Sequence, residues 1–299
     1  MVVNGSISLS RPGQVLGNYI AMAKPGIVLG NLVTLAGGFF LAAKGVVHIP
    51  LLLGTMLGLV LVVASGCALN NVIDRDIDGV MQRTRNRPLV RGALSARSGL
   101  LYATLLGLAG FILLAIATNP LTTLIAAIGY VIYVAVYSLY MKRNSIYGTL
   151  VGSLSGAVPP VVGYCAVTGR FDLGTLLLFA IFSLWQIPHF YAIALFRLQD
   201  YRIAGIPVWP VARGVASTKR QMAYYITAFT GAAALLSLTG YVGHIFLAVS
   251  LVSGGVWLRL AWAGWTTQDD HLWAHKLFVH SIVVVMAISI AMSLDYVRS

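Results

Sequence analysis

The chain has 299 residues, of which 59% are hydrophobic and only 9% are charged. Water-soluble domains carry about 25% charged residues, so this composition excludes an ordinary soluble fold and indicates helices that cross a membrane. The 20 Lys and Arg residues outnumber 8 acidic residues, all Asp, and because they lie between apolar runs they indicate cytoplasmic loops rather than a nucleic-acid-binding surface.

Nine apolar runs are long enough to cross a bilayer, which takes about 20 residues of helix. Longer polar segments separate them at 71–97, 197–220 and 263–275, and no soluble domain interrupts the series. The pattern predicts an all-α polytopic membrane protein with a single domain over residues 1–299. The predicted spans are 19–43, 49–70, 98–117, 120–140, 146–168, 173–196, 221–241, 243–262 and 276–296.

The distribution of Lys and Arg predicts the orientation of the chain. With the N-terminus inside, 17 of these residues fall on the inner side and three, Lys44, Arg170 and Arg298, fall on the outer side. Because cytoplasmic loops carry the excess of positive charge, this split predicts an N-in, C-out topology. Six of the 8 Asp residues also fall on the inner side, although a topogenic signal does not need them. That excess predicts a functional site on the inner face.

The second predicted span ends in a strip of oxygen-bearing side chains. Asn70, Asp74 and Asp78 follow at intervals of four residues, so they share one face of a helix, while Asp76 points elsewhere. Two carboxylates and an amide in a row are ligands that Mg²⁺ prefers. An ordinary polar helix end is the alternative, but carboxylates at a helix C-terminus oppose the helix dipole unless a cation compensates them. The strip therefore predicts a metal site.

Basic side chains follow this strip and also end the fourth predicted span. Arg75 lies within the strip, Arg83 and Arg87 come soon after it, and Arg binds phosphate oxygens through a bidentate fork. For any single arginine, the alternative is that it only adds to the positive charge that keeps a loop on the cytoplasmic side. On the fourth span, Tyr137 and Lys142 lie about 140° apart on an α-helix, so we expect them to converge only if the helix ends between them. Carboxylates and arginines together predict a Mg²⁺–diphosphate site.

The sixth predicted span contains Gln186, Pro188 and His189 within its apolar part. Polar groups at that depth usually face a cavity, and a proline bend frees backbone carbonyls. An interhelical hydrogen bond is the alternative role for His189. The inner loop after this span adds further polar candidates, namely Arg197, Asp200, Tyr201 and Arg202.

Taken together, several motifs resemble the intramembrane aromatic prenyltransferase superfamily. The strip that ends the second span and the run RTRNRPL at 83–89 match its first signature. The resemblance covers about residues 18–295, which is nearly the whole chain. The heme O synthase branch is the most similar, and its likeness is carried by the segments 137–143, 155–160, 185–190 and 200–207.

The resemblance implies nine transmembrane helices around a central cavity in a bacterial inner membrane. A diphosphate site would lie at the cytoplasmic mouth, capped by segments 71–97 and 197–220. The implied cofactor is Mg²⁺, the donor is farnesyl diphosphate, and heme b is the acceptor substrate rather than a cofactor. The implied reaction adds farnesyl and water to a vinyl group and gives heme O. A downstream heme A synthase or a heme-copper oxidase would receive the product, and the lipid bilayer surrounds the chain.

Residue roles follow from the same resemblance. Lys142 is expected to act with the metal ligands in catalysis. Asp200 matches only one Asp of the superfamily's second DxxxD motif, so we expect either fewer protein ligands for a second Mg²⁺ or a single tightly held ion. His189 is expected either to ligate the heme iron or to position the ring, and Arg197 or Arg202 to bind the propionates. The expected metal ligands are Asn70, Asp74, Asp78 and Asp200. The expected substrate-binding residues are Arg75, Arg83, Arg87, Tyr137, Arg143, Gln186, His189, Arg197, Tyr201 and Arg202.

Three other functions are compatible with parts of the sequence. The first is a related enzyme that prenylates a quinone or chlorin precursor, and the 185–190 run argues against it. The second is a transporter, since polar residues in broken helices also mark substrate paths, but the one-sided placement of charge argues against that function. The third is a non-catalytic membrane assembly factor for a heme-copper oxidase, which would bind heme but ignore farnesyl diphosphate.

Overall fold

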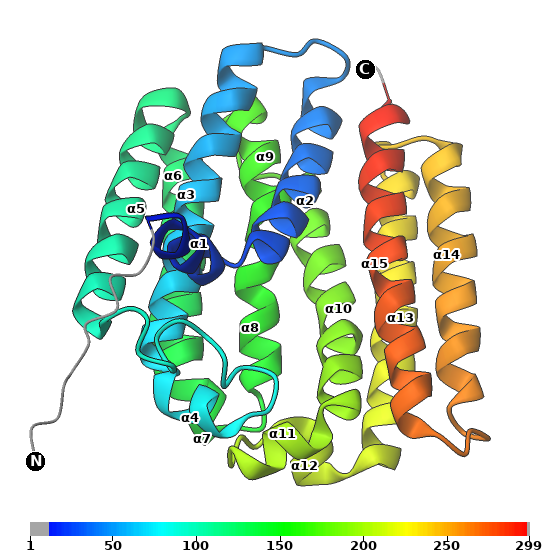
Figure 1. Ribbon diagram of the computed structural model, residues 1–299. Helices are drawn as coiled ribbons and strands as arrows, with labels where there is room; N and C mark the ends of the chain where they lie inside the picture. The colour runs from blue at the N-terminus through cyan, green and yellow to red at the C-terminus, as the bar shows by residue number, and fades with distance from the viewer. Residues whose placement is uncertain (1–11, 298–299) are drawn as a thin grey trace, which may run out of the picture.

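The structure, a computed structural model, describes residues 12–297 and is built almost entirely of helices (Figure 1). The helices of the first half are α1 (Pro12–Ala23), α2 (Pro25–Ala43), α3 (Ile49–Ile73), α4 (Arg75–Val80), α5 (Ala96–Ala117), α6 (Pro120–Val131), the π-helical segment η1 (Ile132–Met141) and α7 (Lys142–Asn144). Those of the second half are α8 (Gly148–Gly156), α9 (Val158–Thr168), α10 (Leu173–Phe196), α11 (Leu198–Ile203), α12 (Trp209–Arg213), α13 (Val215–Leu238), α14 (His244–Ala263) and α15 (Asp270–Leu294).

Among the described residues, eight helical segments are long and apolar enough to cross a membrane, which confirms an all-α polytopic membrane protein. Helix α13 is not one of the eight, although it has 24 residues and packs beside α14 (Figure 1). Its first turns carry Lys219, Arg220 and other polar side chains, which lower its hydropathy. The eight segments are Pro25–Ala43, Ile49–Ile73, Ala96–Ala117, Pro120–Asn144, Gly148–Thr168, Leu173–Phe196, His244–Ala263 and Asp270–Leu294.

Capping residues decide where the long helices begin. Asp172 and Thr175 form a capping box, and α10 begins directly after Asp172 with the bounds that the apolar run predicts. At α15, Asp269 accepts the N–H of Leu272 over 3.0 Å, so the helix begins at Asp270. The predicted start of the last span at 276 was therefore wrong by six residues, because apolarity alone does not register a capped polar first turn.

Two of the predicted spans are interrupted. A continuous span over 19–43 is wrong, because α1 ends at Ala23 and α2 begins at Pro25. Between them Lys24 adopts a left-handed conformation, with φ 52° and ψ 70°. A proline disfavours the right-handed helical conformation of the residue before it, which explains the break. The predicted span 146–168 is likewise divided into α8 and α9 at Ala157, shortly before two prolines.

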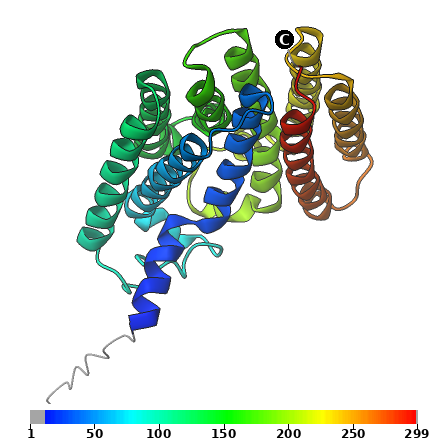
Figure 2. The same ribbon diagram turned by 90° about the horizontal axis from the view of Figure 1, so that it is seen from above.

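Close helix packing holds the centre of the molecule together. Seen from above, the long helices stand side by side (Figure 2). Helices α2 and α9 approach so closely that a Cβ at Gly38 would lie 2.0 Å from the carbonyl oxygen of Pro160. A Cβ at Gly163 would lie 2.2 Å from the carbonyl oxygen of Leu35. Small residues allow such contacts between membrane helices, where lipid gives little hydrophobic driving force for association.

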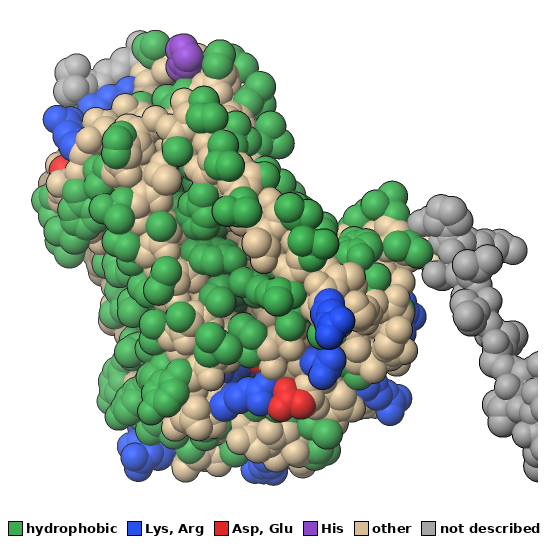
Figure 3. Space-filling view, turned by 90° about the vertical axis from the view of Figure 1, so that its left-hand side faces the viewer, with side chains coloured by type: hydrophobic (Ala, Val, Ile, Leu, Met, Phe, Trp, Pro, Cys, Tyr) green, Lys and Arg blue, Asp and Glu red, His purple; other side chains and the backbone are tan. Residues whose placement is uncertain are grey.

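The short helices gather at one end of the molecule. Helices α4, α7, α11 and α12 all lie at the lower end in Figure 1, so the predicted loops 71–97 and 197–220 lie near each other. A hydrogen bond of 2.9 Å from the backbone N–H of Gln82 to Oδ1 of Asp200 connects them directly. Figure 3 shows hydrophobic side chains over much of one side of the molecule, with Lys, Arg and acidic side chains close together near its lower edge.

Candidate active site

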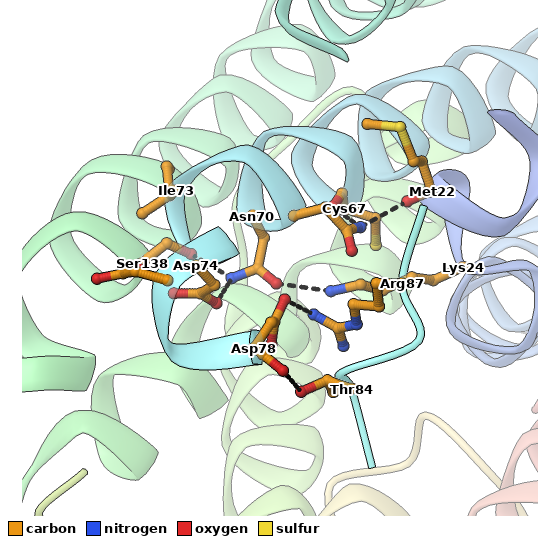
Figure 4. Close-up of polar contacts among 12 residues, drawn as sticks. Met22, Lys24, Cys67, Asn70, Ile73, Asp74, Asp78, Thr84, Arg87 and Ser138 are labelled. Atoms are coloured by element: carbon orange, nitrogen blue, oxygen red, sulfur yellow. Dashed lines mark hydrogen bonds and ion pairs between the residues drawn. The ribbon is translucent and has the colours of Figure 1, made fainter. Parts of the chain in front are cut away.

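The predicted strip spans the junction between α3 and α4. Helix α3 ends at Ile73, so Asp78 belongs to a separate short helix. The backbone ladder nevertheless continues, since Asp74 N–H donates to the carbonyl of Asn70 over 2.9 Å and Asp78 N–H donates to that of Asp74 over 2.8 Å. Asn70, Asp74 and Asp78 thus face the same region (Figure 4), and they are only 5%, 0% and 2% exposed.

Asn70 lies at the centre of a polar network that holds this strip. Its Nδ2 donates to Oδ2 of Asp74 over 2.7 Å and to Oγ of Ser138 over 3.2 Å. Its Oδ1 accepts from Nζ of Lys24 over 2.6 Å (Figure 4). Neither Lys24 nor Ser138 was predicted from the sequence as a site residue, although the Lys-Pro pair at 24–25 is a local signal for an interrupted helix.

Cations compensate both buried carboxylates of the strip. Oδ2 of Asp74 is paired with Nζ of Lys142, and Oδ2 of Asp78 is paired with Nη1 of Arg87. The second oxygen of Asp74 lies 3.8 Å from Nη2 of Arg143. Buried carboxylates need such partners, because an uncompensated charge in a low-dielectric interior is strongly destabilising. The groups expected to bind phosphate therefore already surround the expected metal ligands.

A π-helical segment positions Lys142. The backbone N–H of Lys142 donates to the carbonyl of Tyr137, five residues earlier. This pattern places the two residues about one turn apart, so their convergence does not require the helix to end between them, contrary to the expectation from α-helical geometry. π-helical turns are rare in proteins, and those that occur are often found at functional sites. Tyr137 itself stacks on Tyr133, with ring centroids 5.9 Å apart.

Arg143 is engaged by Asp76 and by the end of α3. Its two terminal nitrogens donate to Asp76 over 2.7 and 2.6 Å, and Nη2 also donates to the carbonyl of Ile73 over 2.8 Å. The side chain of Asp76 is 66% exposed, which agrees with the prediction that it points away from the strip. The hydrogen bond from Arg143 lowers the pKa of Asp76 to about 2, so this carboxylate is ionised at neutral pH.

Asp200 lies in the first turn of α11 and is 7% exposed. Its Oδ1 accepts the Gln82 hydrogen bond described above, which joins the loop after α10 to the loop after α3. The neighbouring Tyr201 is half-buried, and burial raises the pKa of its phenol while the charge of Arg83 acts in the opposite direction. Segments from the two halves of the chain therefore meet around Asp200.

The other predicted residues are distributed around this centre. Gln186 is buried against α8, where a Cβ at Gly156 would lie 2.1 Å from its Oε1. Nδ1 of His189 lies 2.7 Å from Oγ of Ser281. Arg75 and Arg202 are exposed, and within the described part of the chain their side chains form no hydrogen bond or ion pair. Arg83 and Arg197 line a cleft between α10 and α15. The network of the strip, by contrast, unites Asn70, Asp74, Asp78, Arg87 and Lys142.

The donor set of the strip fits a magnesium ion that a diphosphate helps to hold. Over residues 12–297, no group of three or more His, Cys, Asp or Glu side chains is arranged to bind a metal. Mg²⁺ does not require one, since it is usually bound by one or two carboxylates together with substrate phosphates and water. Oδ1 of Asp74 is buried and accepts no hydrogen bond from any described residue, so it is an acceptor that a cation would satisfy.

Sequence comparisons identify related proteins. The model of the UbiA prenyltransferase family matches residues 31–283. A protoheme IX farnesyltransferase of Edwardsiella ictaluri is 56% identical over 288 residues, which are 96% of this chain and 93% of that protein. One of Yersinia enterocolitica is 54% identical over 296 residues, covering 99% and 96% of the two chains. These relatives confirm the resemblance to heme O synthases.

Solved structures share the fold. A structure described for digeranylgeranylglyceryl phosphate synthase has a TM-score of 0.78 at 14% identity, covering 94% of this chain and 98% of that one. A UbiA homolog from Archaeoglobus fulgidus bound to GPP and Mg²⁺ has a TM-score of 0.71 at 16% identity, covering 93% and 100%. With its family model, its relatives and its fold in agreement, the chain belongs to the UbiA prenyltransferase family.

Proposed function

We propose that this protein is a protoheme IX farnesyltransferase, which transfers farnesyl from farnesyl diphosphate to a vinyl group of heme b and so makes heme O. The identity of 54–56% to protoheme IX farnesyltransferases over nearly the whole chain carries this proposal. The site supports it, because buried carboxylates and phosphate-binding cations lie together at the end of several membrane helices.

The reaction breaks one bond in the donor and forms two in the acceptor. The bond between C1 of farnesyl and the diphosphate oxygen breaks, and its electron pair leaves with diphosphate. The π electrons of the vinyl group form the new carbon–carbon bond to C1, which leaves a cation on the other vinyl carbon. The oxygen of a water molecule adds to that carbon and a proton is released, so the products are heme O, diphosphate and H⁺.

The chain's own residues would stabilise the leaving group. Mg²⁺, when bound, supplies positive charge that offsets the negative charge of the departing diphosphate. Asp74, Asp78 and Asp200 would hold the metal, with Asn70 fixing the orientation of Asp74 through its 2.7 Å hydrogen bond. Lys142 and Arg87 pair with the carboxylates and would turn toward the phosphates when these arrive. Removal of one such charged contact costs about 10²- to 10³-fold in rate, by analogy with single oxyanion-hole donors.

The remaining predicted residues would bind the two substrates around this centre. Arg75, Arg83, Arg143 and Arg202 would add positive charge at the mouth, and Tyr137 and Tyr201 would line it. The homolog bound to GPP and Mg²⁺ supports a magnesium-dependent prenyl diphosphate site in this fold. Gln186 and His189 would contact the acceptor deeper in the protein.

For the topology, α13 would act as a ninth span, since it is long enough and packs against α10 and α14. The 17-to-three distribution of Lys and Arg favours an N-in, C-out orientation in a bacterial inner membrane. Of the counted residues, Arg11 and Arg298 lie outside the described part of the chain. Residues 1–299 would form one domain, and segments 71–97 and 197–220 would cap its active site. A heme A synthase or a heme-copper oxidase would receive the product.

Mass analysis of heme extracted from membranes tests the function. Membranes that contain the protein, supplied with heme b, farnesyl diphosphate and Mg²⁺, are expected to yield a heme heavier by one farnesyl group and one hydroxyl group. EDTA should abolish that product. Membranes with unchanged heme but a prenylated quinone or chlorin would support a related enzyme, and heme binding without diphosphate release would support an assembly factor.

A further inference from the structure

A cleft of about 530 Å³ lies beside the candidate active site. It is formed by the last turns of α10 and the first turns of α15, and the loop after α4 borders it. This volume falls within the range of about 300–1,000 Å³ that is usual for sites of drug-sized ligands. The side chains that give the cleft its chemistry are Arg83, Arg197, Phe196, Phe278, His271 and His275.

Among residues 12–297, the cations of the cleft have no anionic partner. Nε of Arg197 is buried and makes no hydrogen bond within this range, and its guanidinium lies 5.4 Å from the ring centroid of Phe196. In the described residues, the side chain of Arg83 forms no ion pair or hydrogen bond either. A buried donor without an acceptor is destabilising, so a ligand that satisfies it is stabilising. Two guanidiniums without a lining carboxylate point to a ligand with carboxylates or phosphates.

The wall of the cleft is aromatic. The rings of Phe196 and Phe278 lie 5.5 Å apart, and His275 packs 5.5 Å from Phe196 and 6.3 Å from Phe278. His271, one helical turn earlier, lies 6.2 Å from Phe196. Aromatic faces of this kind favour a flat, conjugated ligand. Neither of these imidazoles takes part in a hydrogen bond or ion pair within residues 12–297, so both remain available to a ligand.

The cleft also adjoins the expected metal ligands. Arg83 lies five residues after Asp78, and Arg197 lies three residues before Asp200. His275 is five residues into α15, which at about 1.5 Å per residue places it roughly 8 Å above the start of the helix. A molecule bound there would have one edge near water and the other beside apolar helices, next to the site proposed for the diphosphate.

We propose that this cleft binds the heme acceptor, with the propionates on Arg83 and Arg197, the ring against Phe196 and Phe278, and the iron on His275. The assignment rests on the proposed function, because it takes heme as the substrate. His275 is the ligand because it touches both phenylalanine rings. His189 is not among the residues that line the cleft, so it is assigned a positioning role, with its Nδ1 2.7 Å from the hydroxyl of Ser281 and its ring stacked on Trp185 at 4.9 Å.

Heme titration of the purified full chain, without farnesyl diphosphate, tests the propionate contacts apart from turnover. For the wild type, heme dimethyl ester should bind about 10²- to 10⁴-fold more weakly than heme, because both propionates lose their charge and each charged hydrogen bond contributes about 1.5–3 kcal/mol. In the double variant Arg83→Gln/Arg197→Gln, heme and its ester should bind equally weakly. Wild-type protein that does not distinguish the ester from heme, or a double variant that still does, would overturn the assignment.

The Soret spectrum of bound heme tests the iron ligand. His275→Ala should lose the spectrum of a histidine-ligated heme, and added imidazole should restore it. His280→Ala is the matched control, because His280 lies on the same helix but contacts the carbonyl of Ser253 in α14. A spectrum that is lost in His189→Ala and retained in His275→Ala would assign the iron to His189 instead.

The experiments can distinguish a wrong assignment of the heme site from a wrong proposed function. If the wild type makes heme O while the double variant has an unchanged KM for heme, the function stands and the cleft is rejected. If membranes with the wild type make no heme O, the proposed function is rejected, whatever the titrations show.

Discussion

The backbone N–H of Gln82 donates a hydrogen bond of 2.9 Å to Oδ1 of Asp200, across 118 residues of the chain. The bond joins the segment that follows α3 to the segment that follows α10, at the end of the molecule where the short helices gather (Figure 1). It gives Asp200 a structural role beside the metal-binding role proposed for it. A substitution that preserves the acceptor and removes the charge can separate the two roles.

Asp200→Asn is expected to keep the loop in place and to weaken the metal site. The amide oxygen of Asn can still accept from Gln82, whereas a neutral oxygen is a poorer ligand for Mg²⁺ than a carboxylate. We expect kcat/KM to fall about 10²-fold and the half-saturating Mg²⁺ concentration to rise. Magnesium titrations of farnesyl transfer measure both effects.

Asp200→Ala provides the comparison, because it removes the acceptor as well as the charge. It should lower the free energy of unfolding by a further amount of about 0.5–1.5 kcal/mol, the net contribution of one hydrogen bond. An Asp200→Asn protein with wild-type magnesium dependence would show that Asp200 does not bind the metal.

Asp74→Asn and Asp78→Asn are each expected to reduce heme O formation by about 10²- to 10³-fold while the protein still accumulates in membranes. Each change removes a buried negative charge from the proposed metal strip. Asp76→Asn is the matched control, since this neighbouring carboxylate is 66% exposed and is bound by Arg143. Product formation per membrane-inserted protein is the measurement. Equal losses in all three variants would argue against a specific strip.

Lys24→Gly separates backbone conformation from charge at the first helix break. Glycine adopts the left-handed conformation of residue 24, at φ 52°, without strain, so the change of backbone residue should not by itself lower the stability. The variant loses the ammonium group that contacts Asn70 over 2.6 Å, and we expect farnesyl transfer to fall at least about tenfold, as for other charge-assisted contacts.

Lys44→Gly is the control for Lys24→Gly, because Lys44 also has a positive φ, of 46°, but lies at the far end of α2. Steady-state rates and unfolding curves in detergent are to be compared for the two variants. Equal activity of both would remove Lys24 from the site.

Gly38→Ala is expected to destabilise the protein by about 1–3 kcal/mol, as overpacking does in well-packed interiors. The added Cβ would lie 2.0 Å from the backbone oxygen of Pro160, so α2 and α9 would have to separate. Gly30→Ala on the same helix meets nothing within 4 Å and should leave stability unchanged or raise it. Thermal unfolding in detergent checks the pair, and similar curves for both variants would contradict the packing argument.

Local signals in the sequence were sufficient for much of the fold. The bounds of α10 follow from an apolar run that starts after the Asp172 cap, and both features can be read without knowledge of other helices. The Asn70–Asp78 strip was also predictable, because four-residue spacing specifies a shared face as long as the backbone ladder continues, and it does. The predictions failed where a polar first turn was capped, as at Asp269, or where a residue before proline left the helix, as at Lys24.

Local signals in the sequence could not predict the tertiary contacts around the site. Lys24 meets Asn70 across 46 residues, and Asn70 meets Ser138 across 68. The π-helical hydrogen bond from Lys142 to Tyr137 changes which residues share a side of the helix, and side-chain periodicity does not reveal it.

By itself the sequence determined a helical membrane protein with acidic oxygens on one helix face and positive charge nearby, because composition, spacing and charge act locally along the chain. Only the tertiary structure decided which cation neutralises which carboxylate, that Gln82 holds Asp200, and that two arginines and two histidines from distant segments border one cleft. The physical reason is that these partners come together through helix packing, which depends on contacts between residues far apart in the chain.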